Sequence, residues 1–272
     1  MKDESSITVV KLGGTEGVDF SAICQDAVEL LKQGKRLVFV HGGSAEANAL
    51  GEGLGTPPKM ITSPSGYTSR YTDRKTLEIF MMAVNGKVIS LLTEQLQMLG
   101  VNAFGLCGLD GKLIQATRKE SVLSIENCKR KIIRDDYTGK IDTVNSELLL
   151  MLLNADYMPV IAPVAVSEKG EALNVDADRA AAMVASALKA ENLLLLTAVP
   201  GLMKKFPDES TLIRQLPQSQ LAASEAAQGR MKKKVLGAEE ALKGGVSRVI
   251  IADGRIQNPI SNALAGNGTV IE

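Results

Sequence analysis

The sequence predicts an α/β fold with an open, mainly parallel central sheet that is sandwiched by helices. Short apolar runs typical of strands alternate along the chain with segments of helical periodicity. Strands that are separated by helices favour parallel neighbours joined by right-handed crossovers. Residues 193–198 form a nearly pure apolar run, which indicates a strand in the middle of a parallel sheet covered on both faces.

Each expected element follows from its local pattern. Strands are expected where short apolar runs end at turn residues, at 7–12, 36–40, 101–106, 158–164, 193–198, 248–252 and 269–271. Helices are expected where apolar residues recur with the helical period, at 20–33, 45–53, 72–99, 145–154, 177–188 and 232–243. Thr72 or Asp73 is the expected N-cap of the long helix. The short strands 112–115 and 131–134 are expected to form a surface hairpin around the charged turn 126–130.

Composition limits the class of protein. The 272 residues suit one α/β domain, in which a boundary near Pro163 separates an N-terminal lobe, 1–163, from a C-terminal lobe, 164–272. Tryptophan is absent and the 31 basic residues balance the 31 acidic ones, so neither nucleic acid nor membrane is an expected partner. The 3 dispersed cysteines, the polar N-terminus and the lack of a membrane-length apolar run predict a cytoplasmic protein.

Two glycine pairs end the first two expected strands and mark a candidate phosphate site. Gly13 and Gly14 follow Lys11 closely, and Gly42 and Gly43 end the second strand. Because glycine has no side chain, a phosphate can approach the backbone N–H groups there, and the lysine adds a positive charge. The sequence contains neither the P-loop motif nor the G-x-S-x-G motif of hydrolases, and the only histidine, in the second glycine turn, is interpreted as structural.

Two segments supply groups suited to an acceptor carboxylate. Arg70 precedes the long helix, and a guanidinium there can bind a carboxylate through two parallel hydrogen bonds. Asn174 and Asp178 lie around the start of the small-residue helix. The amide could bind an anionic oxygen, and the carboxylate could organise lysines or a magnesium ion. Taken alone, the arginine is better explained as a surface ion pair and the aspartate as a helix N-terminal charge.

Two further segments suit a nucleotide. Thr197 and Gly201 lie where the central strand ends, a good place to hold one. Lys232 and Lys234 belong to three consecutive lysines at the start of a helix. Cations there oppose the helix dipole, so an anionic ligand would offset their unfavourable interaction. Taken alone, the lysines are better explained as a solvated helix face.

The order of these motifs resembles the amino-acid kinase family along essentially the whole chain, and its acetylglutamate kinase branch is the most similar. The landmarks are Lys-Leu-Gly-Gly at 11–14, His-Gly-Gly at 41–43, Arg-Tyr-Thr-Asp at 70–73, Asn-Val-Asp-Ala-Asp at 174–178 and Met-Lys-Lys-Lys-Val at 231–235. The resemblance implies transfer of the γ-phosphate of ATP onto a carboxylate, which gives an acyl phosphate. It also implies that the N-terminal lobe binds the acceptor and forms a dimer, while the C-terminal lobe binds ATP.

The resemblance gives each candidate residue a role. Lys11 and Lys234 would stabilise the transferring phosphoryl group, and Asp178 would hold both lysines in place. The nucleotide would be bound by Gly13, Gly14, Thr197, Gly201 and Lys232, and the acceptor by Gly42, Gly43, Arg70 and Asn174. Mg²⁺ would arrive with ATP, and no protein side chain is expected to bind it.

The acceptor segment departs from ordinary acetylglutamate kinases, which usually read Gly-Leu-Arg-Val-Thr-Asp. Here residues 67–69 separate Gly66 from Arg70. Together with 74–80, 108–111, 136–139 and 228–231, this segment is similar to the kinases of the carrier-protein lysine pathway. Those enzymes phosphorylate the side-chain carboxylate of α-aminoadipate, whose amino group is blocked by the C-terminal glutamate of a small acidic carrier protein. Some relatives accept carrier-linked glutamate.

A carrier-linked acceptor implies a basic docking surface on the enzyme. The expected hairpin offers Lys129, Arg130, Lys131 and Arg134, and the start of the long helix offers Arg74 and Lys75. An ordinary solvated turn explains the hairpin charges equally well. Because few residues precede the first strand, we expect a plain homodimer without the arginine inhibition of relatives that carry an extra N-terminal helix.

Three functions remain open from the sequence. The first is an ATP- and magnesium-dependent kinase for carrier-linked aminoadipate in lysine biosynthesis. The second is an N-acetylglutamate kinase of arginine biosynthesis, or an enzyme that accepts carrier-linked glutamate and serves both pathways. The third is a catalytically silent nucleotide-binding sensor, which the joint presence of Lys11, Asp178 and Lys234 disfavours.

Overall fold

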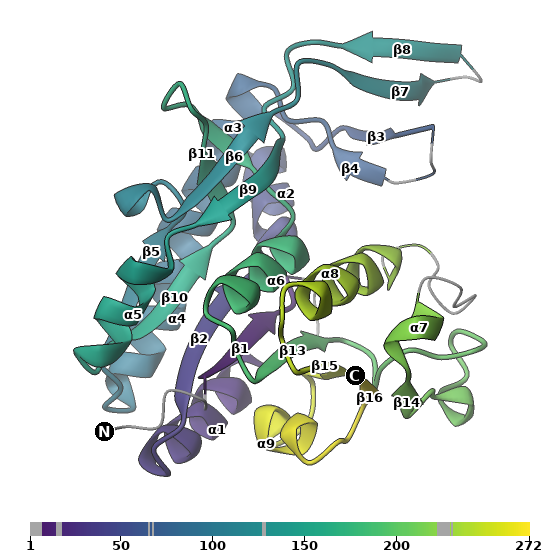
Figure 1. The fold of residues 1–272 in the computed structure, drawn as a ribbon. Coiled ribbons are helices and arrows are strands. Elements are labelled where there is room, and N and C mark those ends of the chain that lie inside the picture. Colours follow the sequence, from purple (N-terminus) through teal and green to yellow (C-terminus); the bar gives the residue numbers. More distant parts are fainter. Residues whose placement is uncertain are drawn as a thin grey trace.

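The centre of the protein is a sheet of eight strands, and the computed structural model describes residues 7–14, 18–64, 66, 68–126, 129–221, 229 and 231–272. In spatial order the strands are β14 (Gln215–Leu216), β16 (Thr269–Ile271), β15 (Arg248–Asp253), β13 (Asn192–Thr197), β1 (Ile7–Leu12), β2 (Arg36–His41), β10 (Met158–Ala162) and β5 (Ala103–Cys107). Neighbouring strands are parallel except β15 and β16. The predicted open, mainly parallel α/β fold is therefore confirmed (Figure 1).

Helices cover both faces of this sheet because alternate residues of a strand point to opposite sides. In β1, Ile7 and Val9 belong to one hydrophobic layer, and Val10 and Leu12 belong to the other. The first layer is completed by α5 (Ser146–Asn154), α6 (Ala177–Ala187) and α8 (Met231–Lys243). The second is completed by α1 (Phe20–Lys32), α2 (Ser44–Gly53), α3 (Arg74–Met81), α4 (Ile89–Met98) and α9 (Pro259–Leu264).

Smaller β elements lie at one end of the molecule, at the top of Figure 1. A four-stranded sheet contains β12 (Ala172–Asn174), β11 (Val164–Val166), β6 (Ile114–Arg118) and β9 (Gly139–Val144). Two hairpins extend beyond it. One pairs β3 (Met60–Thr62) with β4 (Thr68–Arg70), and the other pairs β7 (Val122–Glu126) with β8 (Lys129–Ile133). The remaining elements are α7 (Gln218–Leu221) and the 3₁₀ turns η2 (Asp110–Lys112) and η3 (Glu209–Thr211).

The predicted long helix runs from α3 through the π-helical segment η1 (Met82–Val88) into α4. Its N-cap is Asp73, whose carboxylate accepts a hydrogen bond from the backbone N–H of Thr76 at 2.8 Å. The stretch Arg74–Met98 is long and apolar enough to cross a membrane, although 44% of its most apolar window is buried inside the protein. Polar residues recur along this helix, so the sequence shows no uninterrupted apolar run of membrane length there.

The predicted surface hairpin exists with a different partner strand. Residues 131–133 pair with β7, whereas 114–118 pair with β9, so the expected pairing of 112–115 with 131–134 is wrong. The physical reason is the tight turn: Glu126 and Lys129 lie opposite each other in the ladder. A connection this short brings the immediately preceding segment back, and the earlier strand remains free to pair elsewhere.

The predicted strand 158–164 is divided at Pro163. β10 ends at Ala162 in the large sheet, and β11 begins at Val164 in the four-stranded sheet. Proline has no backbone N–H to donate, which favours a break in the ladder. The large sheet takes strands from both sides of residue 163, so the boundary between the lobes 1–163 and 164–272 stays a prediction.

Candidate active site

The two glycine turns lie side by side because β1 and β2 are parallel neighbours, with Leu12 opposite His41. A Cβ atom on Gly14 would lie 2.5 Å from the backbone N of Gly43, so no side chain fits there. Gly42 donates its N–H to the oxygen of Leu12 at 3.0 Å and therefore has none to offer a ligand. Within the described ranges, the N–H groups of Gly14 and Gly43 make no backbone hydrogen bond, so they remain suited to an anion.

The buried histidine of the second turn supports its backbone. The Nδ1 atom of His41 donates to the oxygen of Gly42 at 3.0 Å, and its Nε2 atom has no partner among the described residues. Burial, with a smaller contribution from the charge of Lys11, lowers the pKa of His41 to about 4. The imidazole is therefore neutral at pH 7 and adds no charge to the site.

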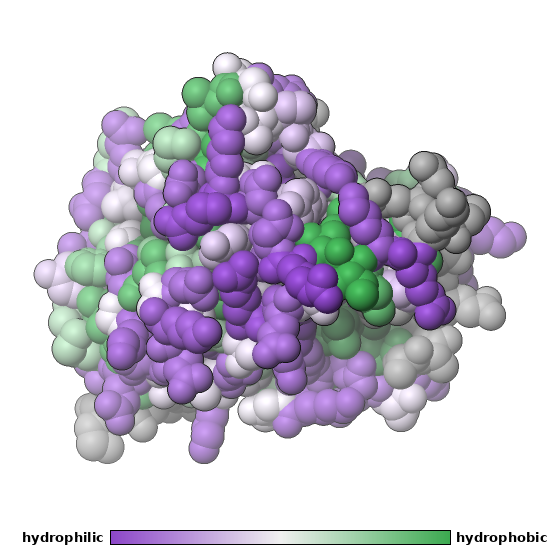
Figure 2. Space-filling view, turned by 90° about the horizontal axis from the view of Figure 1, so that it is seen from above, coloured by the Kyte–Doolittle hydropathy of each residue, from purple (hydrophilic) through white to green (hydrophobic). Residues whose placement is uncertain are grey.

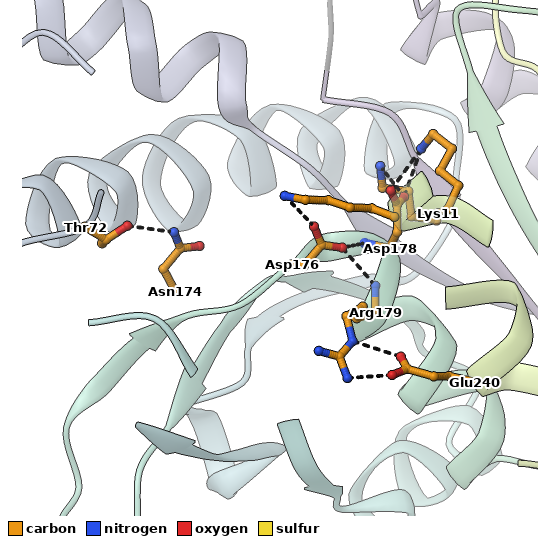
Figure 3. A network of polar contacts seen from close by, with 9 residues as sticks. Lys11, Thr72, Asn174, Asp176, Asp178, Arg179 and Glu240 are labelled. Atoms are coloured by element: carbon orange, nitrogen blue, oxygen red, sulfur yellow. Dashed lines mark hydrogen bonds and ion pairs between the residues drawn. The ribbon is translucent and has the colours of Figure 1, made fainter. Parts of the chain in front are cut away.

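A buried cluster of Asp178 and two lysines lies beside these turns (Figure 3). The Nζ atom of Lys11 lies 2.8 Å from Oδ1 of Asp178. The Nζ atom of Lys234 lies 3.0 Å from Oδ1 and 3.1 Å from Oδ2 of the same carboxylate. One carboxylate from α6 thus joins a lysine of the central strand β1 to a lysine of α8.

Helix capping and helix packing bring this cluster together. Asp176 is the N-cap of α6 and accepts hydrogen bonds from the backbone N–H groups of Asp178 (3.0 Å) and Arg179 (3.2 Å). The guanidinium of Arg179 binds Glu240 of α8 through two hydrogen bonds of 2.9 and 2.6 Å. A Cβ atom on Gly237 would lie 3.2 Å from the oxygen of Asp178, which shows how closely the two helices approach.

The charges of the cluster depend on one another. Burial alone would raise the pKa of Asp178, but the charges of Lys11 and Lys234 outweigh burial and hold it far below its usual range. Burial alone would lower the pKa of Lys11, but Asp178 outweighs burial and the pKa is raised. Burial lowers the pKa of Lys234, and repulsion from Lys11 adds to this despite the attraction of Asp178. The cluster therefore contains an ionised carboxylate and an excess of positive charge.

The predicted acceptor residues lie near each other on the side of the small sheets. Arg70, at the end of β4, donates from Nη2 to the oxygen of Ser44 at 3.2 Å, beside the second glycine turn. The Nδ2 atom of Asn174 donates to Oγ1 of Thr72 at 3.1 Å. Figure 3 shows this amide across from the lysine cluster, with Asp176 between them. Burial lowers the pKa of Arg70.

The predicted nucleotide residues end up at the same edge of the central sheet. Thr197 closes β13 opposite Asp253, and its oxygen accepts a hydrogen bond from the N–H of Gly254 at 2.7 Å. Gly201 has a φ of 154°, and a Cβ atom there would lie 2.6 Å from Oγ1 of Thr269. Since the carboxyl ends of parallel strands meet at this edge, it is the expected ligand side of an α/β sheet.

The other two predicted nucleotide residues flank the cluster. Gly13 lies against β13, where a Cβ atom would be 3.0 Å from the oxygen of Leu196. Lys232 is exposed at the start of α8, two residues before the buried Lys234. Sequence reasoning missed Asp253, whose carboxylate binds Arg255 at 2.6 Å beside Thr197. The sequence signal that points to Asp253 is its position at the end of an expected strand.

Both oxygens of Asp178 accept hydrogen bonds from lysine ammonium groups. In the described part of the chain, no group of three or more His, Cys, Asp or Glu side chains could hold a metal ion. Of the two possibilities left open for Asp178, the structure therefore supports the organisation of lysines.

A model of the amino acid kinase family matches residues 6–253. The chain belongs to the amino acid kinase family. It is 55% identical over 267 residues to the [LysW]-aminoadipate kinase of Deinococcus radiodurans, which covers 98% of this chain and 91% of that protein. It is 51% identical over 266 residues to the [LysW]-aminoadipate kinase of Thermus thermophilus, with 97% and 99% covered.

Other relatives and solved structures agree with this family and fold. A putative [LysW]-aminoadipate/[LysW]-glutamate kinase of Nitrosopumilus maritimus is 40% identical over 265 residues, covering 97% of this chain and 98% of that protein. A Giardia carbamate kinase has a TM-score of 0.69 at 15% identity and 99% coverage of both chains. An N-acetylglutamate synthase from Neisseria gonorrhoeae has a TM-score of 0.78 at 25% identity, covering 98% of this chain and 59% of that one.

We predict that replacing Asp178 by Asn destabilises the protein, because two buried lysines lose their counter-ion. The free energy of unfolding at pH 7, measured by urea denaturation, should fall by about 3–5 kcal/mol. Since the folded-state pKa of Asp178 is depressed, its stabilisation is complete above about pH 4 and is lost at lower pH. The difference between wild type and variant should therefore shrink in acid.

The matched control is Glu46→Gln, which removes an exposed carboxylate 2.6 Å from Lys87. An exposed pair of this kind contributes about 0–1 kcal/mol. Equal stability of wild type and Asp178→Asn at pH 7 would contradict the central role of this carboxylate.

Proposed function

We propose that this kinase transfers the γ-phosphoryl group of ATP to the side-chain carboxylate of α-aminoadipate carried by LysW, in lysine biosynthesis. The observation that carries the proposal is the Lys11–Asp178–Lys234 cluster beside the glycine turns. It offers positive charge and N–H donors to an anion and no base. Relatives that share 51% and 55% identity over nearly their whole length are named for this acceptor.

The proposed chemistry needs charge and alignment rather than proton transfer. An ionised acceptor carboxylate is already a nucleophile, and phosphoryl transfer has a loose transition state that positioning and positive charge stabilise. Lys11 and Lys234 would bind the oxygens of the transferring group while Asp178 holds both ammonium groups in register. The N–H groups of Gly14 and Gly43 would donate to phosphate oxygens. Mg²⁺ bound to ATP would shield its phosphate charge without a protein ligand.

The two substrates would approach from different sides of the cluster. Thr197, Gly201, Gly13 and Lys232, around the ends of β1 and β13, would hold ATP. Arg70 and Asn174, on the side of the small sheets, would hold the acceptor. The guanidinium suits a carboxylate of the acceptor, because such a pair forms charge-assisted hydrogen bonds.

The β7–β8 hairpin is the proposed docking surface for the acidic carrier. Arg130, Lys131 and Arg134 are exposed on or just after β8. The same hairpin exposes Leu123, Ile125 and Ile132, whose exposed fractions are 43%, 42% and 53%. Figure 2 views the molecule from this end and shows apolar patches among hydrophilic side chains. A mixed surface of this kind suits a protein partner better than a purely solvated turn would.

Carrier-linked glutamate is the second candidate acceptor. The Nitrosopumilus relative is named for both aminoadipate and glutamate, and the two acceptors differ by one methylene, which a pocket discriminates by only about 1–3 kcal/mol. The same chain could therefore use both, in lysine and arginine biosynthesis.

We also propose that a second copy of the chain covers the β5 edge of the sheet. Leu91, Met98 and Phe104 expose 53%, 82% and 42% of their surface there, although all three are apolar. β5 is an edge strand, and a groove of about 410 Å³ runs between it and the long helix. Asn85 Oδ1 and Thr93 Oγ1 in that groove are buried and have no hydrogen-bond partner among the described residues. A partner chain there would explain why a helix of membrane-spanning length is so apolar on its outer face.

A cytoplasmic location agrees with the described cysteines. Cys24 and Cys107 are free and buried, and burial raises the pKa of the Cys24 thiol to about 12. Such thiols are inert and suit a reducing compartment. Cys128 lies outside the described residues.

The proposed function predicts an acyl phosphate from ATP and LysW-linked aminoadipate, which hydroxylamine traps as a hydroxamate. Lys11→Ala should lower kcat about 10²–10³-fold, the usual cost of removing one preorganised donor. Lys87→Ala, which changes an exposed lysine paired with Glu46, should retain wild-type turnover. Preference for free N-acetylglutamate would assign the enzyme to arginine biosynthesis instead, and no product from any acceptor would favour a nucleotide sensor.

The docking surface predicts a salt-dependent interaction. Arg130→Glu combined with Lys131→Glu should raise KM for the LysW-linked acceptor about fivefold or more at low salt and less at high salt. KM for ATP and for N-acetyl-aminoadipate should stay the same. Lys32→Glu combined with Lys35→Glu, which reverses two exposed charges at and just after the end of α1, is the control. An unchanged KM for the LysW-linked acceptor would remove the hairpin from the docking surface.

The covered β5 edge predicts a dimer in solution. Sedimentation velocity should give the mass of two chains for wild type and of one chain for Leu91→Glu combined with Phe104→Glu, because charges would be buried in an apolar interface. Phe206→Glu, at an aromatic residue that is 75% exposed in a loop after β13, should remain dimeric. A wild-type monomer or hexamer would contradict the proposal.

A further inference from the structure

Asp136 is a buried carboxylate that lies outside the lysine cluster. Only 1% of its surface is exposed. Its oxygens accept hydrogen bonds from the backbone N–H of Thr72 at 3.0 Å and of Thr138 at 2.8 Å, and from the hydroxyl of Thr138. A buried carboxylate is unfavourable unless donors of this kind satisfy it. This group is well satisfied, and its donors come from two separate segments of the chain.

The backbone around Asp136 joins the two segments that carry the proposed acceptor residues. Tyr137 donates its N–H to the oxygen of Thr72 at 2.7 Å, and its own oxygen accepts from the N–H of Asn174 at 2.9 Å. On the other side, Arg118 of β6 lies 3.7 Å over the Tyr137 ring and donates from Nε to the oxygen of Asp136 at 3.1 Å. The segment 136–138 is therefore held from both sides between the β4 region and β12.

The side chain of Thr72 links the segment held by Asp136 to the two proposed acceptor residues. Its hydroxyl donates to the oxygen of Arg70 at 3.1 Å and accepts from Nδ2 of Asn174 at 3.1 Å. The Thr72 hydroxyl has one hydrogen, which it donates to the carbonyl oxygen of Arg70. It can therefore only accept a hydrogen bond from the Asn174 amide, and this fixes the orientation of that amide. Among the residues that the structure describes, the Oδ1 atom and the second N–H of the Asn174 amide have no hydrogen-bond partner and so suit a ligand.

We propose that Asp136 is a positioning residue for the carboxylate acceptor. It fixes the backbone of Thr72, and Thr72 holds Arg70 and Asn174 at the spacing that the acceptor requires. The inference rests on the proposed function, since it assumes that this pair binds the acceptor. A merely structural carboxylate would support the fold as a whole, and its loss would impair both substrates alike.

The test is Asp136→Asn, which conserves volume but replaces one acceptor oxygen by an NH₂ group, and this group then faces either the N–H of Thr72 or the N–H and hydroxyl of Thr138. KM for the LysW-linked acceptor should rise about tenfold or more, the effect of one lost charge-assisted hydrogen bond. KM for ATP, and ATP affinity by calorimetry, should stay within twofold of wild type. Asp142→Asn is the matched control: Asp142 accepts from the hydroxyl of Thr117 at 2.7 Å in the same small sheet, but on an exposed surface. It should leave both KM values unchanged.

Thr72→Val keeps the proposal testable if Asp136→Asn does not fold. It removes the hydroxyl link to Arg70 and Asn174 but keeps the N–H that Asp136 accepts, and it should raise the same KM. Wild-type turnover with an unshifted acceptor KM in both variants, or a parallel rise of both KM values, would overturn the positioning role alone. Absence of product from wild-type enzyme would overturn the proposed function and this inference with it.

Discussion

The structure depends on one buried carboxylate that balances two lysines. Asp178 contacts Lys11 of the central strand and Lys234 of α8 at hydrogen-bond distances, with all three side chains almost fully buried. Desolvating three charges is unfavourable, and only close mutual contact compensates for it. The close packing of α6 against α8 and the cap that starts α6 both serve to keep these distances short. The arrangement concentrates positive charge where the glycine turns present backbone N–H groups.

Both backbone N–H groups and side chains contribute to the candidate site. Around the two touching turns, the described groups that face a ligand are N–H groups, whose position is set by the strands and cannot change by rotation about side-chain bonds. The lysines are mobile by nature but are fixed here by a shared partner. Towards the small sheets, Arg70 and Asn174 are fixed more indirectly, through Thr72. The groups proposed for phosphoryl transfer and those proposed for acceptor binding are therefore held by separate supports, the first at the edge of the central sheet and the second on the small sheets.

Local patterns in the sequence predict much of this architecture, and contacts between distant residues account for the rest. The strand containing Lys11 and the final strand were found with their observed ends, because their apolar runs are short and bounded. The predicted partner strand of β8 was wrong, because the length of the connection, and not the strand sequences alone, decides which strands pair. The grouping of residues 11, 178 and 234 came from resemblance in motif order, as no local pattern links them. Segment 136–139 was singled out only by resemblance, because the hydrogen bond between Asp136 and Thr72 joins residues that are far apart in the sequence.

The contact between the glycine turns has a consequence for how this enzyme can diversify. A Cβ atom at Gly14 would lie 2.5 Å from a backbone nitrogen, and one at Gly43 would lie 2.6 Å from a side-chain carbon of Val84. Any other residue at these two positions would therefore clash with its neighbours. At Gly66, in the connection from β3 to β4, a Cβ atom would meet nothing within 4 Å, but the φ of 81° is a backbone conformation that residues other than glycine rarely adopt. Substitution is therefore opposed by different causes at the two places: by lack of space where the glycine turns meet, and by backbone conformation alone at Gly66.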